Sequence, residues 1–244
     1  DIEIDEEDNF WLINSEHALI RGNLVFQKVR VPLNSLQTVV KFKGSYLVGD
    51  ENGFYSFANK NLEQLNLENV THILVEDDYL ILGTMSNGIK VYNKRLELVE
   101  SINEWHGIEN QSVLYMAYSG GYLYASSLSG VMKFSFKEGN ISPVQSLNSV
   151  VGSEYIYSIL LDGNYIYFGT DRSGLIKWDQ GKDVIQPFKK LRDGKKLGSV
   201  YSMTKDSDGK IWFTTSKAIA FFAFYLKSVF AISISGYTIY YLRS

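Results

Sequence analysis

Short apolar runs alternate along most of the chain with short polar turns, and these runs lack the apolar spacing of an amphipathic helix. One pattern recurs: an aromatic-rich apolar run ends in Gly-Thr, a polar turn follows, and a small residue opens a second apolar run. The clearest copies are 79–84 with 88–93 and 165–170 with 174–179. Looser copies lie at 10–13 with 18–20, 46–49 with 53–55, 122–125 with 130–134, and 210–215 with 218–221. The recurrence predicts repeated pairs of β-strands.

The small residue that opens the second run gives the period of the repeat. It stands at positions 18, 53, 88, 130, 174 and 218, so successive copies are 35, 35, 42, 44 and 44 residues apart. Further apolar runs flank these pairs, which predicts four short strands per unit, named A to D in chain order. The A–B turns, such as 162–164 and 206–209, hold Asp, Asn and Gly. These residues tolerate the positive φ of tight hairpins.

Four-stranded units at this period predict an all-β fold, a β-propeller of four-stranded antiparallel blades. A lone sheet exposes two faces, and radial stacking covers both of them. The tail at 229–241 resembles 156–168, so we expect six blades or a truncated seven-bladed ring, and we favour a fragment of a longer protein. The expected units of this single domain, 1–244, are 1–33, 34–67, 68–103, 111–148, 153–190 and 198–228, with a partial unit at 229–244.

The apolar tail has a second interpretation. Residues 218–242 carry a single charge, Lys227, and are numerous enough to cross a bilayer as a helix. However, Lys227 would then lie near the middle of the bilayer, and Ser233, Ser235 and Gly236 interrupt the run. The match to the repeat favours propeller strands over a membrane segment.

Composition narrows the chemistry. The 244 residues include no Cys and three His, and 24 Lys and Arg against 27 Asp and Glu give a net charge of −3. Disulfides and thiolate metal sites are therefore excluded, and we expect no metal, no cofactor and no nucleic-acid partner. The sequence also lacks a Gly-x-Ser-x-Gly elbow, a phosphate-binding Gly-x-x-x-x-Gly-Lys loop and a His-Glu-x-x-His pair. We expect no catalytic residues in this segment.

Binding residues are expected on the loops of one face, because the D–A and B–C connections of a propeller share the mouth of the central channel. The connection at 103–112 contributes Trp105, His106 and Asn110, whose ring and amide groups suit a sugar. Alternatively, Trp105 fills the space between two blades. The B–C turn of the fifth unit adds Asp171 and Arg172, for which the alternative is an ordinary surface ion pair.

A second D–A connection is strongly basic. Residues 189–196 hold five Lys and Arg in eight positions. Two interpretations stay open for this segment: contact with an anionic ligand or partner, or ordinary solvated charge.

The repeat resembles the two-component regulator propeller family. Segments 162–170 and 208–215, each followed by a small-apolar-x-x-aromatic run, are similar to that family's Asp-x-x-Gly-x-Ile-Trp-Ile-Gly-Thr pattern. The sequence departs from the pattern at 125–126, which is Ala-Ser, and at 214–215, which is Thr-Thr. In this family such propellers form the extracytoplasmic sensory part of membrane histidine kinases and hybrid regulators, for which glycans are common signals.

The resemblance implies a non-catalytic ligand-sensing propeller of a bacterial two-component (hybrid histidine kinase) protein, located in the periplasm. Its partners would be a small molecule or oligosaccharide and the downstream signalling domains of the same protein, with membrane contact only through segments outside this chain. A homodimer is compatible with this hypothesis. The alternatives are a stand-alone protein-interaction scaffold and, third, a propeller enzyme such as a hydrolase or lyase.

Overall fold

The computed structural model contains six four-stranded antiparallel sheets, each built from four consecutive strands. It describes residues 31–33, 35–58, 61–103, 112–191, 194–205 and 209–215 in full, and the backbone of the strands outside these ranges. The first three sheets are β1 (Ile2–Ile4), β2 (Phe10–Ile13), β3 (Leu19–Gly22) and β4 (Phe26–Val29); β5 (Thr38–Phe42), β6 (Ser45–Gly49), β7 (Phe54–Ala58) and β8 (Asn61–Asn66); and β9 (Val70–Glu76), β10 (Tyr79–Thr84), β11 (Ile89–Tyr92) and β12 (Leu98–Ile102).

The other three sheets follow the same order along the chain. They are β13 (Tyr115–Ser119), β14 (Tyr122–Ser127), β15 (Gly130–Lys137) and β16 (Asn140–Ser146); β17 (Ile156–Asp162), β18 (Tyr165–Thr170), β19 (Leu175–Asp179) and β20 (Val184–Phe188); and β21 (Val200–Lys205), β22 (Ile211–Thr215), β23 (Ile219–Ala223) and β24 (Ser228–Ile232). One short helix, α1 (Asn148–Val151), is the only helix within the described part of the chain.

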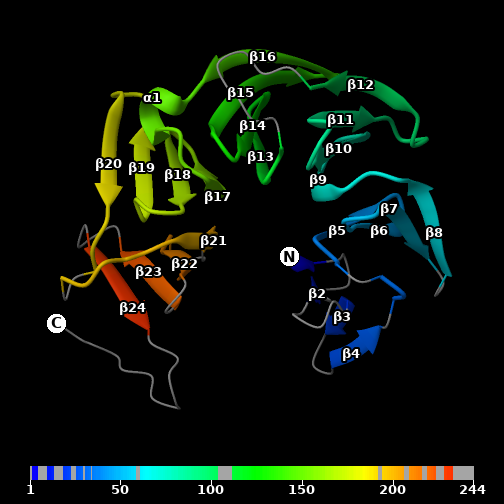
Figure 1. Cartoon of the computed structure of the whole chain (residues 1–244), viewed down its shortest axis with the longest axis horizontal. Helices are drawn as coiled ribbons and strands as arrows, with labels where there is room; N and C mark the ends of the chain where they lie inside the picture. Colours follow the sequence, from blue (N-terminus) through cyan, green and yellow to red (C-terminus); the bar gives the residue numbers. More distant parts are fainter. Residues whose placement is uncertain are drawn as a thin grey trace.

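The sheets stand around a common centre as propeller blades (Figure 1). The first strand of each sheet lies nearest the centre and the fourth lies at the periphery. The predicted all-β propeller of four-stranded antiparallel blades is confirmed. Figure 1 also shows that the arc is open between the sixth sheet and the first.

Successive side chains of a strand point to opposite faces of its sheet. In this protein the two faces of a blade therefore contribute to two different cores. In β10, Leu80 and Leu82 pack with Val40 and Leu47 of the second sheet. The intervening Ile81 packs instead with Met116 and other residues of the fourth sheet. Neither Leu80, Ile81 nor Leu82 has exposed surface. Burial of both faces of each sheet therefore provides the main stabilisation of the stack.

The sixth sheet is buried on one face only: the face that points away from the fifth sheet is exposed. Ser202 pairs with Thr214 across β21 and β22, in the register that Ser158 and Gly169 have in the fifth sheet. Ser158 is buried, whereas Ser202 and Thr214 are both exposed. This difference agrees with the open side of the arc in Figure 1. The number of blades in a closed ring stays a prediction.

The structure corrects the interpretation of residues 229–232. Strand β24 pairs with β23 along its whole length and completes the sixth sheet, so these residues do not begin a partial unit at 229–244. An alternating apolar run fits an inner strand or an outer strand equally well, and only the pairing partner distinguishes the two. Residues 233–244 lie outside the described part.

The membrane interpretation of 218–242 is contradicted where the structure can test it. Residues 219–223 and 228–232 form strands rather than one continuous helix. Among the described residues, no helix has both the length and the hydropathy needed to cross a bilayer.

Candidate functional site

Two of the five residues expected to bind a ligand lie in the described part of the chain. Asp171 and Arg172 occupy the turn between β18 and β19. Trp105, His106 and Asn110 fall in the connection from β12 to β13, outside the described residues, and their role stays a prediction.

The β18–β19 turn is held rigidly by its own polar groups. The Thr170 hydroxyl donates to the carbonyl of Gly174 over 3.0 Å and accepts from the Ser173 amide over 2.8 Å. Gly174 has φ +74°, in the left-handed region that glycine adopts without strain. The second Gly of the repeated pattern is therefore needed to close this turn.

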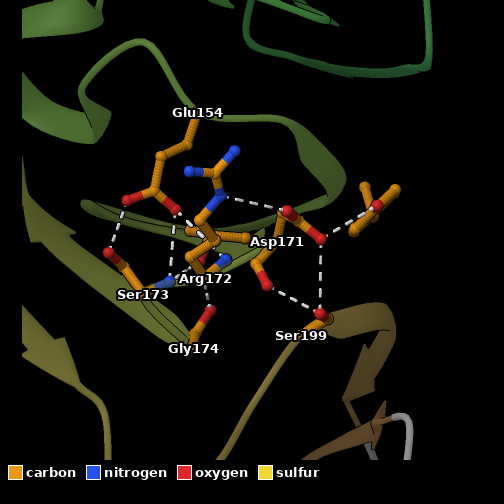
Figure 2. Close-up of polar contacts among 8 residues, drawn as sticks. Glu154, Asp171, Arg172, Ser173, Gly174 and Ser199 are labelled. Atoms are coloured by element: carbon orange, nitrogen blue, oxygen red, sulfur yellow. Dashed lines mark hydrogen bonds and ion pairs between the residues drawn. The ribbon is translucent and has the colours of Figure 1, made fainter.

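Glu154, from the connection before β17, clamps the same turn from above (Figure 2). Its carboxylate accepts hydrogen bonds from the backbone amides of Arg172 and Ser173, over 3.3 and 3.2 Å, and from the Ser173 hydroxyl. Backbone amides and a hydroxyl thus satisfy this carboxylate. Glu154 acts as a positioning residue for the turn.

Asp171 joins the turn to the fifth and sixth sheets. Its Oδ1 accepts from the Tyr157 hydroxyl over 3.1 Å and from the Ser199 hydroxyl over 3.3 Å. The Ser199 hydroxyl also lies 2.6 Å from the Asp171 carbonyl. Burial, the hydrogen bond to Asp171 and the charge of Asp171 raise the pKa of the Tyr157 phenol, so that it stays a neutral donor.

Arg172 presents its guanidinium to solvent at the edge of this network. The side chain is 82% exposed, and its Nε lies 3.4 Å from Oδ2 of Asp171. A pair this exposed contributes little stability. The pair instead orients Arg172, because it leaves the two terminal nitrogens of the guanidinium pointing away from the turn (Figure 2). These nitrogens can donate two parallel hydrogen bonds to an acid group.

Three tyrosines lie on the segments that Asp171 contacts or that follow its partner Ser199. Tyr157 of β17 and Tyr201 of β21 have ring centroids 5.1 Å apart, with the planes tilted by 55°. Tyr201 is 44% exposed, and Tyr155, whose carbonyl accepts the Asp171 amide, is 42% exposed. Exposed aromatic faces beside polar groups suit the C–H faces and hydroxyls of a sugar.

The basic connection from β20 to β21 is ordered in its described parts. Leu191 and Leu197 donate backbone hydrogen bonds to the carbonyls of Lys195 and Lys189, over 2.8 and 2.9 Å. An isolated bridge pairs Lys190 with Lys196, and the Leu197 side chain is buried. The result is a small hairpin with four exposed lysines, at Lys189, Lys190, Lys195 and Lys196. Ser199 links it to the turn that carries Arg172.

We call this assembly the rim: the 171–174 turn, Tyr155, Tyr157, and residues 189–191 and 194–201. Sequence analysis identified the turn and the basic connection but not Glu154, Ser199 or the tyrosines. The available signal for the tyrosines was their position at the starts of two inner strands, in Tyr155-Ile156-Tyr157 and Val200-Tyr201.

On the opposite face of the propeller, the turns of the fifth sheet form an open hollow of about 490 Å³. It is lined by the A–B turn at 162–164 and by Asp179 and Lys182. Its carboxylates already have partners. Asp162 pairs with Lys205 over 2.6 Å, and Asp179 accepts the amides of Gly181 and Lys182. The described residues contain no cluster of three or more His, Asp or Glu side chains suited to a metal ion.

Comparison with known proteins supports the fold and the repeat. Residues 194–217 match the family model "two component regulator propeller". Two similar structures come from B. thetaiotaomicron and are extracellular domains, one of the putative one component system BT4673 and one of the putative hybrid two component system BT3049. The first has a TM-score of 0.77 and 16% identity, covering 95% of this chain and 32% of that one. The second has a TM-score of 0.68 and 16% identity, covering 82% and 30%.

The WD40 β-propeller domain of Doa1 is also similar, with a TM-score of 0.72 at 12% identity, covering 93% of this chain and 79% of that one. No curated protein has a significant match to the sequence. The chain spans about a third of the length of the B. thetaiotaomicron domains. The resemblance predicted from the sequence is confirmed by the matched repeat and the shared fold. The chain is a β-propeller whose residues 194–217 match the two-component regulator propeller model.

Proposed function

We propose that this propeller is a non-catalytic ligand-sensing module of a bacterial two-component signalling protein, and that it binds an oligosaccharide at the rim. The observation that carries the proposal is the exposure of Arg172, Tyr155 and Tyr201 on segments that hydrogen bonds of Glu154, Asp171 and Ser199 hold together. A rigid loop that leaves such groups unsatisfied by the protein is typical of a binding surface.

The comparisons support the signalling context. The matched repeat bears the name of two-component regulators, and the similar B. thetaiotaomicron structures are extracellular domains of putative one-component and hybrid two-component systems. We extend both statements to this chain as a proposal: a periplasmic module whose partners are signalling domains of the same protein.

The rim spans two blades, and this gives a route for a signal. Asp171 of the fifth sheet contacts Ser199 at the entry to the sixth, and Tyr157 lies against Tyr201. A ligand that touches both sheets acts on their relative arrangement. It transmits a signal only if it binds one arrangement more tightly than another.

Trp105, His106 and Asn110 belong to this proposal as well. They lie in the β12–β13 connection, which joins the outer strand of one sheet to the inner strand of the next, as the 189–199 connection does. In a propeller of antiparallel four-stranded blades, connections of this kind are expected on one face. We propose that these side chains extend the binding face beyond the rim.

Titration calorimetry with a panel of neutral and acidic tetrasaccharides tests the proposal. We expect at least one tetrasaccharide to bind, and Tyr201→Ala to weaken that binding by about tenfold, because one stacked ring contributes roughly 0.5–1.5 kcal/mol beyond its burial. Tyr122→Ala is the matched control, since Tyr122 is 40% exposed but begins β14 at the opposite end of its sheet. Equal losses in both variants, or no binding by any tetrasaccharide, would contradict the proposal.

A further inference from the structure

We infer that the ligand of the rim is an acidic oligosaccharide, with its carboxylate or sulfate group held by Arg172 and by the lysines of the 189–196 hairpin. The inference rests on the proposed function and specifies its ligand class. It depends on how charge is distributed between the two faces of the propeller.

On the face formed by the A–B and C–D turns, three of the described lysines are paired with acids, whereas Lys137 and Lys182 stand singly in two different C–D turns. Lys43 and Lys94 both contact the carboxylate of Asp78, the latter over 3.6 Å. Lys205 lies 2.6 Å from Asp162. These pairs neutralise the lysines locally, so an anion gains little from approaching them.

On the rim, by contrast, several exposed lysines share one hairpin. Among the described residues, Lys189, Lys190 and Lys196 have no acid within ion-pair distance. The isolated bridge places Lys190 and Lys196 directly opposite each other in the hairpin, and Lys189 is next to Lys190 in the chain. A fixed cluster of positive charge attracts anions over distances near the Debye length, about 8 Å at physiological salt.

The two described acids of the rim do not cancel this charge. Glu154 directs its carboxylate toward the amides of Arg172 and Ser173. Asp171 accepts hydrogen bonds from Tyr157 and Ser199, and it contacts Arg172 only through Nε. Both carboxylates are therefore engaged by the protein, while the outer edge of the Arg172 fork faces solvent. That edge matches the two oxygens of a carboxylate or a sulfate.

The tyrosines make a saccharide the favoured carrier of the acid group. Tyr155 and Tyr201 each expose about two fifths of their surface, and Tyr157 contacts both Asp171 of the turn and the ring of Tyr201. A free inorganic anion would gain no favourable contact from these aromatic faces. An acidic sugar places apolar C–H groups, hydroxyls and a charged group within a single residue, which suits this combination.

Calorimetry with linear tetragalacturonic acid, its methyl ester, a chondroitin sulfate tetrasaccharide and neutral cellotetraose tests the inference. We expect tetragalacturonic acid or the chondroitin sulfate fragment to bind, more weakly as salt rises, and the uncharged ester and cellotetraose to bind at least tenfold more weakly. Binding of tetragalacturonic acid identifies the carboxylate as sufficient for recognition, and binding of the chondroitin sulfate fragment alone identifies the sulfate, since both molecules carry carboxylates. The ester comparison uses the unmodified protein, so it is valid even where a variant fails to fold.

Variants locate the site. Arg172→Gln is expected to reduce affinity for the acid about tenfold or more, because it removes charge-assisted hydrogen bonds to the acid group. The double variant Lys190→Gln with Lys196→Gln should reduce affinity and flatten the salt dependence. Lys182→Gln is the control for charge, since Lys182 lies in the C–D turn of the fifth sheet, on the opposite face of the propeller. It should leave affinity unchanged.

The outcomes separate this inference from the function on which it rests. Equal binding of neutral and acidic tetrasaccharides, unaffected by Arg172→Gln, would overturn the inference and leave the sensing proposal standing. Binding of no tetrasaccharide at all would overturn both. Preferential binding of a poly-glutamate peptide would replace the saccharide with an acidic protein segment, and would also overturn the inference.

Discussion

Replacing Phe168 with alanine is expected to lower the free energy of unfolding by about 3–5 kcal/mol, as is typical of buried phenylalanine. The Phe168 ring has no exposed surface and packs against the fourth sheet, in a core that includes Tyr124 and Val131. Its removal leaves a cavity between two blades that cannot close without moving a whole sheet. Urea denaturation followed by tryptophan fluorescence measures the change.

Val184→Ala is the control for Phe168→Ala. Val184 is 54% exposed on the outer strand β20, so its truncation is expected to change stability by less than about 0.5 kcal/mol. A small effect of Phe168→Ala, comparable with that of Val184→Ala, would show that the fourth and fifth sheets do not share a core.

Gly169→Ala is expected to destabilise the protein by about 1–3 kcal/mol, although it adds only one methyl group. A Cβ at this position would lie 2.7 Å from the carbonyl oxygen of Val200 and 2.5 Å from the Ser158 hydroxyl oxygen. The carbonyl belongs to the sixth sheet and cannot rotate away, so the two sheets must separate. Thermal unfolding measured by circular dichroism gives the change.

Gly181→Ala provides a matched comparison on the same blade. Its added Cβ would meet its nearest neighbour, a side-chain oxygen of Asp179, at 3.5 Å, an ordinary contact. The melting temperature should therefore be nearly unchanged. If Gly169→Ala were equally neutral, the close approach of the fifth and sixth sheets would be wrong.

Phe168 and Gly169 also show what the sequence could predict. Their alternation within an aromatic run defines a strand with two buried faces, and its return with a fixed period defines the blade. Pattern alone could not assign residues 229–232, because an apolar alternation fits strand A and strand D equally. Their pairing with β23 depends on which edge of the sheet is free, and that is a property of the assembled blade.

The rim was predictable only in part, for a different reason. Asp171 and Arg172 were found because a polar turn between two apolar strands is visible in the sequence. Glu154 lies 19 residues from Ser173 along the chain, and Ser199 lies 28 residues from Asp171. No local pattern encodes contacts at such separations, since the propeller topology creates them. The structure accordingly gives Asp171 a positioning role and leaves Arg172 as the group that faces a ligand.

The most direct test of the account is two-dimensional amide NMR of the labelled chain during titration with the tetrasaccharide that binds most tightly. We expect the perturbed amides to cluster at 154–157, 171–173 and 194–201, on both of the sheets that the rim connects. Perturbations confined to 162–164 and 179–182, on the opposite face, would contradict it.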